Sequence, residues 1–133
     1  SIRVARTLIR LKKKYPDNVT IILGNRDLNK IRFTSELAAT ELTDEALSEV
    51  PGPFWVPEKK RVSPLQHLTK LIAARDEIDV KQVTQKMLAK ENTLANRVRW
   101  MLKETMGSDG EFERRRAELA LLRGDLPGQN VSE

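Results

Sequence analysis

Four consecutive residues, Gly24 to Asp27, have the residue types of a turn that binds metal or phosphate. They follow Val19–Leu23, a nearly continuous β-branched run typical of a strand that is buried on both faces of a parallel sheet. In α/β sheets, ligands bind in the crevice at the carboxyl ends of such strands. Gly24 lets the backbone turn sharply there, and the side-chain carbonyl of Asn25 is a neutral oxygen ligand for a divalent cation. The pattern predicts a binding site at this turn.

Three cations, Arg26, Lys30 and Arg32, accompany the turn. A guanidinium does not release a proton near neutral pH, but it can hold a phosphate bidentately and offset developing charge. Lys30 and Arg32 lie in a short helix expected over residues 27–33, whose N-terminus would face a bound anion. The local charge therefore favours a phosphate group as the ligand.

The sequence Gly24-Asn25-Arg26-Asp27 resembles the Gly-Asn-His-Asp/Glu signature of the calcineurin-like (serine/threonine-phosphatase-like) metallophosphoesterases. In that family the asparagine binds one metal of a two-metal centre, and the histidine, held by the acid after it, assists departure of the leaving oxygen. The resemblance implies a metal-dependent hydrolase of phosphate esters, with Asn25 as the metal ligand and Arg26 and Asp27 as the catalytic pair. Asp27 would be the orienting carboxylate. Arg26 stands in the histidine's place and argues for phosphate binding, shared with Lys30 and Arg32, as in divergent members with a Gly-Asn-Arg-Asp-x-Asn-Lys pattern.

The same resemblance implies two divalent metal ions of the Mn, Fe, Zn or Mg type and a phosphorylated substrate, either a small molecule or a phosphoprotein. The family's Asp-x-His and Gly-Asp-x-x-Asp-x-Gly motifs are not in this sequence, which has no cysteine and one histidine, His67. Asn25 cannot hold a metal alone. We therefore expect residues outside this chain to complete the centre, and the chain, which matches the family over residues 1–33, to be part of a longer enzyme. His67 is expected to be a surface or partly buried histidine.

Two other interpretations compete with this one. The turn could be structural only, with Asn25 or Asp27 capping a helix. Alternatively, the chain could be a non-catalytic helical interaction module with a basic end that binds protein or nucleic acid. Residues 1–33 hold nine Lys/Arg and two Asp, whereas the whole chain has a net charge of +5. The basic runs Lys12–Lys14 and Arg114–Arg116 have no aromatic platform beside them, so we expect them to be solvated, and nucleic acid is not the favoured partner.

The 133 residues are 39% hydrophobic and 32% charged, which is the composition of one polar globular domain. The absence of cysteine excludes disulfide scaffolds, thiolate zinc sites and cysteine nucleophiles. No apolar run approaches the roughly 20 residues of a membrane span, so we expect a cytoplasmic protein without a membrane partner.

The fold class expected from these patterns is an α/β fragment, mostly helical, with one buried strand after a helix and several amphipathic helices behind it. Trp55 and Trp100 are expected to pack against other residues. Four regions are predicted: a metallophosphoesterase-like core segment over 1–50, a proline-rich loop over 51–62, a helical insertion or cap over 63–124, and a flexible tail over 125–133. The individual elements expected are helices over 2–14, 44–50, 64–75, 79–106 and 111–123, and the strand over 19–23.

Overall fold

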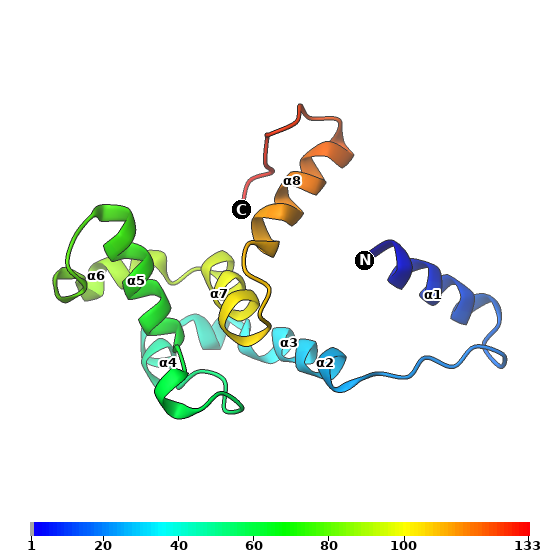
Figure 1. The fold of residues 1–133 in the computed structure, drawn as a ribbon, viewed down its shortest axis with the longest axis horizontal. Coiled ribbons are helices and arrows are strands. Elements are labelled where there is room, and N and C mark those ends of the chain that lie inside the picture. Colours follow the sequence, from blue (N-terminus) through cyan, green and yellow to red (C-terminus); the bar gives the residue numbers. More distant parts are fainter. Residues whose placement is uncertain (1) are drawn as a thin grey trace. The chain divides into compact units, whose positions relative to one another are not determined.

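The computed structural model describes residues 2–133, except for the side chains of Ile2, Arg26 and Asn29 (Figure 1). Its α-helices are α1 (Ile2–Lys14), α2 (Asn25–Leu28), α3 (Arg32–Glu36), α4 (Asp44–Glu49), α5 (Pro64–Asp76), α6 (Gln85–Glu91), α7 (Leu94–Trp100) and α8 (Glu111–Arg123). The 3-10 turns are η1 (Asn29–Ile31), η2 (Ala39–Leu42), η3 (Glu58–Lys60) and η4 (Val80–Gln82), and η5 (Met101–Thr105) is a π-helical turn. No helix within residues 2–133 is long and apolar enough to cross a membrane.

The chain divides into two compact units, one that ends at Arg32 and one that spans Phe33–Glu133. The first unit contains α1, the turn after it, an extended segment, α2 and η1. All the residues predicted to form the metal and phosphate site lie in this first unit. The second unit contains the remaining helices and the hydrophobic core.

The predicted buried strand is wrong, and with it the α/β class, because residues 2–133 are helical and contain no strand or sheet. Val19–Leu23 is extended but has no ladder partner, and Ile22 is 87% exposed. A buried-strand pattern describes how a segment packs between two neighbouring strands and two helix layers. None of the described segments supplies a neighbouring strand, so the β-branched run remains irregular.

The predicted start of a helix at residue 64 is confirmed. The Ser63 hydroxyl accepts a hydrogen bond from the Gln66 backbone N–H (3.1 Å), and the Gln66 side chain accepts one from the Ser63 N–H (3.0 Å). This reciprocal capping box satisfies two N–H groups that a helix N-terminus otherwise leaves without partners, and Pro64 occupies the first helical position. Local chemistry alone therefore fixes the beginning of α5.

The single helix predicted over 79–106 is instead divided into η4, α6, α7 and η5. Two threonines cause the interruptions: the Thr84 hydroxyl accepts from the Met87 N–H and the Thr93 hydroxyl from the Asn96 N–H, both at 3.3 Å. Each threonine has an extended backbone and is the N-cap of a new helix. The apolar periodicity continues across these breaks, which is why it predicts one helix where the structure has several segments.

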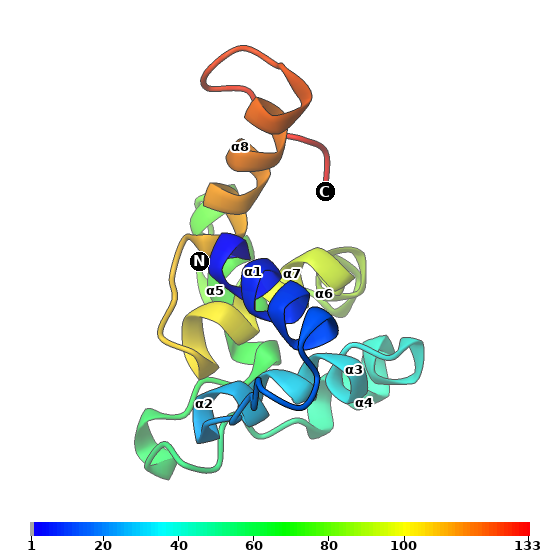
Figure 2. The ribbon, with the colours of Figure 1, turned by 90° about the vertical axis from the view of Figure 1, so that its right-hand side faces the viewer.

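The core of the second unit lies where α5 contacts α4, α6 and α7. Leu47, Leu68, Ile72 and Leu88 form its buried centre. Both Figure 1 and Figure 2 show α8 extending away from this cluster of helices. Trp100 is 1% exposed and its indole N–H donates to the Val62 carbonyl at 2.9 Å, which confirms its predicted packing role.

The proline-rich loop is held by its own polar contacts. Arg61 donates to the carbonyls of Val56 (2.7 Å) and Phe54 (2.8 Å), so one guanidinium links two backbone positions of the loop. Gly52 has a φ of +89°, and a Cβ at this position would lie 3.0 Å from the Val62 carbonyl oxygen. Both the dihedral angle and the close approach require glycine.

Candidate functional site

A tight turn at Gly24 begins the segment that carries the predicted metal and phosphate ligands. The Gly24 carbonyl accepts hydrogen bonds from the N–H groups of Asp27 (3.0 Å) and Leu28 (3.1 Å). In return, the Asp27 carboxylate accepts from the Gly24 N–H at 3.0 Å. Asp27 therefore stabilises the turn and the start of α2, where a carboxylate also interacts favourably with the helix dipole.

Asn25, the predicted metal ligand, is the first residue of α2, and its side chain is exposed. The carboxylate of Asp27 contacts the Gly24 backbone, so the hydrogen bond observed there is a capping contact. The backbone of Arg26 lies in α2, but its side chain is outside the described part of the chain. The turn thus presents the Asn25 amide to solvent and holds the Asp27 carboxylate close to the backbone.

The two other predicted phosphate ligands follow within two turns. Lys30 lies in η1 and is exposed, whereas Arg32 begins α3 and is half-buried. Asn25, Lys30 and Arg32 therefore belong to one nearly continuous helical stretch that runs from residue 25 to residue 36. This stretch carries three cations and one carboxylate between residues 25 and 32.

The donor set at this turn does not fit a complete metal site. Among the residues that the structure describes, no group of three or more His, Asp or Glu side chains could hold a metal ion. Asn25 offers one amide oxygen, and the carboxylate oxygen of Asp27 that faces Gly24 is already an acceptor. A two-metal centre needs several further anionic or imidazole ligands.

His67, the only histidine, belongs to the second unit. It lies in α5 with its side chain 12% exposed, and its Nδ1 is 3.4 Å from Oε1 of Glu104. Burial lowers the pKa of the imidazole, an effect that the nearby Glu104 carboxylate partly offsets. His67 is a partly buried histidine, as the sequence predicts.

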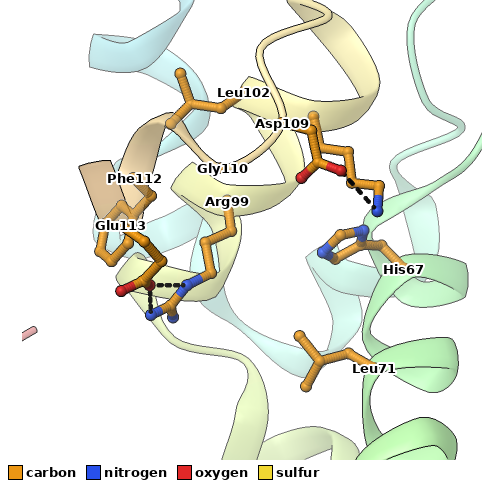
Figure 3. A pocket seen from close by; sticks show the side chains of 9 residues that line it. His67, Leu71, Arg99, Leu102, Asp109, Gly110, Phe112 and Glu113 are labelled. Carbon is orange, nitrogen blue, oxygen red and sulfur yellow. Dashed lines mark hydrogen bonds and ion pairs between the residues drawn. The ribbon is translucent and has the colours of Figure 1, made fainter. Parts of the chain in front are cut away.

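A cavity of about 210 Å³ lies beside His67, between α5, the turn η5 and the first turn of α8 (Figure 3). Figure 3 shows Leu71 and Leu102 on opposite sides of it, with Arg99 and His67 facing each other across it. The residues that line it are His67, Leu71, Arg99, Leu102, Lys103, Asp109, Gly110, Phe112 and Glu113.

The charges of this cavity neutralise one another. The Arg99 guanidinium donates to Glu113 (2.6 Å) and stacks 4.3 Å over the Phe112 ring, while the Lys103 ammonium lies 3.3 Å from Asp109. Arg99 and Arg116 hold the pKa of the Glu113 carboxyl below its ordinary value. Each cation on the wall therefore has a carboxylate partner, and the cavity is suited to a small, largely apolar group and not to an anion.

The sequence did not predict this cavity, because it depends on where the first turn of α8 lies relative to α5 and α7. Gly107 and Gly110 adopt φ of +63° and +78° in the connection, and the π-helical turn before it places Leu102 and Lys103 on the cavity wall. The pair Asp109-Gly110 signals a turn in the sequence, but not the direction of the helix that follows it. A wide π turn is not encoded by any simple residue pattern.

No protein-family model, no curated protein and no solved structure matches this chain.

Proposed function

We propose that this chain supplies one corner of the active site of a metal-dependent phosphoesterase, with Asn25 as a metal ligand and nearby cations binding the phosphate. The observation that carries the proposal is the turn at Gly24. Its reciprocal hydrogen bonds with Asp27 fix the backbone, and Asn25 is exposed directly beside it. A ligand that is held on a fixed backbone and open to solvent is what metal coordination requires.

The charge around the turn supports phosphate as the substrate group. Between residues 25 and 32 there are three cations, Arg26, Lys30 and Arg32, and one acid, Asp27, whose carboxylate caps the turn. Guanidinium and ammonium groups stabilise both a bound phosphate ester and the charge that develops on it during hydrolysis. Asp27 contributes by fixing the turn, so its role in this proposal is positioning.

The donors among the described residues do not complete a metal centre, and we assign the remaining ligands to residues outside this sequence. The ions would be of the Mn, Fe, Zn or Mg type, which accept a neutral amide oxygen among harder ligands. The contribution of this chain is then limited to one oxygen ligand and to the binding of the phosphate group.

The test compares hydrolysis of p-nitrophenyl phosphate and bis-p-nitrophenyl phosphate by the full-length protein with added Mn²⁺. Asn25→Ala should lower kcat/KM about tenfold or more, since loss of even an indirect metal contact has an effect of that order. Asn18→Ala is the matched control, because Asn18 is also an exposed asparagine in a turn of the same unit. Equal rates for the two variants would exclude Asn25 as a metal ligand, and so would equal Mn²⁺ affinities.

A further inference from the structure

The two basic runs of the chain differ in how their charge is neutralised. In α8, Arg114 pairs with Glu111 (2.8 Å), Arg115 with Glu118 (2.5 Å) and Arg116 with Glu113 (2.6 Å). Each arginine of this run therefore has a carboxylate three residues away on the same helix, as in ordinary surface ion pairs. The Arg114–Arg116 run is a neutralised surface.

The cations of helix α1, in contrast, are not neutralised by carboxylates on the same helix. It carries six cations and no acidic residue, and no ion pair joins any of them to a carboxylate within the described part of the chain. Lys12 donates to the Pro16 carbonyl and Lys14 lies over the Tyr15 ring, but neither contact reduces the charge. The cations are Arg3, Arg6, Arg10, Lys12, Lys13 and Lys14.

Five of these cations lie on one side of the helix. At 3.6 residues per turn, all except Lys12 fall within an arc of about 100°, and they extend over about 16 Å of the helix axis. The apolar residues Val4, Leu8 and Leu11 occupy the other side. The positive charge therefore forms a straight, continuous stripe, here called the α1 stripe (Arg3, Arg6, Arg10, Lys13 and Lys14).

We propose that the α1 stripe binds the phosphate backbone of a nucleic-acid strand. Along the axis of a stacked nucleic-acid helix each strand carries one phosphate per 3.4 Å or so, so 16 Å of axis spans about five phosphates of one strand, as many as the stripe has cations. Three of the five cations are arginines, which bind phosphate bidentately. Binding of this kind recognises the backbone and is independent of base sequence.

An anionic membrane surface is the other polyanion that a basic amphipathic helix could contact. Interfacial helices insert Trp, Phe and Leu side chains into the lipid boundary. The apolar side of α1 contains no aromatic residue. The arrangement therefore favours a nucleic-acid strand over a lipid surface.

This inference goes beyond the proposed function, because it assigns a second phosphate-binding surface that needs neither a metal nor hydrolysis. The experiment measures binding of a single-stranded 20-nucleotide oligo(dT) by fluorescence anisotropy, with EDTA present, between 50 and 200 mM NaCl. With five phosphates neutralised, log K should fall against log[NaCl] with a slope of about −3.5, a loss of about a hundredfold in affinity over this range.

Two double variants with the same change in charge distinguish the effect of the α1 stripe on binding from the effect of net charge. Arg6→Gln/Arg10→Gln should change the slope to about −2.1 and weaken binding about 25-fold at 0.1 M salt. Arg114→Gln/Arg115→Gln should leave both quantities unchanged, because those arginines are already neutralised. Equal effects of the two variants, or binding to phosphatidylserine vesicles without binding to oligo(dT), would overturn the proposal.

Discussion

Replacing Arg97 tests the contact that joins α7 to η2 within the second unit. Arg97 in α7 is 2% exposed, and its guanidinium donates to the Glu41 carbonyl in η2 at 2.6 Å. Its Nε is 3.5 Å from the side-chain oxygen of Asn92. Burial lowers the pKa of this guanidinium, and the charges of Glu41 and Glu36 partly offset the effect. It is a buried charge held mainly by a backbone acceptor.

Arg97→Ala should lower the free energy of unfolding by about 2 to 4 kcal/mol. The Glu41 carbonyl then has no donor, which costs about 1 to 3 kcal/mol, and the two buried methylenes that are lost (Cγ and Cδ) contribute about 0.8 kcal/mol each. The release of a buried charge to solvent offsets part of this loss. Arg97→Met keeps a stem of similar length, so it should be more stable than the alanine variant by about 2 kcal/mol.

The assay is urea unfolding followed by tryptophan fluorescence, since Trp100 is buried in the native unit. Arg123→Ala is the control, because Arg123 is an exposed arginine at the end of α8 and should change stability by less than about 0.5 kcal/mol. If Arg97→Ala were no more destabilising than the control, the guanidinium would not be buried in this contact. If the methionine and alanine variants had equal free energies of unfolding, the methylene groups of Arg97 would not contribute to packing in the native unit.

Two further predictions concern His67 and Gly52. Because the pKa of His67 is lowered in the folded state, the unfolded state binds more protons just below pH 6.5. The contribution of His67 to stability should therefore be complete above pH 6.5 and decrease as the pH falls through the folded pKa. His67→Gln should remove this pH dependence from urea midpoints measured between pH 5 and 7.5. An unchanged pH dependence in the variant would contradict the burial of His67. Gly52→Ala should lower stability by more than about 1 kcal/mol, whereas Gly128→Ala, with the same φ of +89° but no atom within 4 Å, should cost less in the same unfolding assay. Equal costs would show that the approach to the Val62 carbonyl does not matter.

Local chemistry made some of these elements predictable. Ser63, Pro64 and Gln66 specify the start of α5 through contacts within four residues, and together they form a capping box in the structure. The boundaries of α8 follow in the same way from Gly110 and Gly124, both of which adopt a positive φ. Where hydrogen bonds link near neighbours in the chain, the sequence alone is enough to predict where a helix begins or ends.

Other features depend on partners far away in the chain. Val19–Leu23 has the composition of a buried strand, but a strand needs neighbours, and the described residues supply none. Arg97 reaches Glu41 across 56 residues, and the cavity beside His67 is formed by residues of α5, α7, η5 and the start of α8. At the candidate site, the sequence predicted the turn, and the contact of Asp27 with the Gly24 backbone is the helix capping that the structural interpretation of this turn allowed.

Mn²⁺ titration of the ¹⁵N-labelled full-length protein tests whether Asn25 is a metal ligand. Paramagnetic broadening of side-chain amide signals reports how close each asparagine lies to the bound ion. The Asn25 amide should broaden at the lowest Mn²⁺ concentration, while that of Asn18 in the same unit should remain sharp. Broadening at Asn18 first, or a sharp Asn25 signal once Mn²⁺ is bound, would show that Asn25 does not bind the metal.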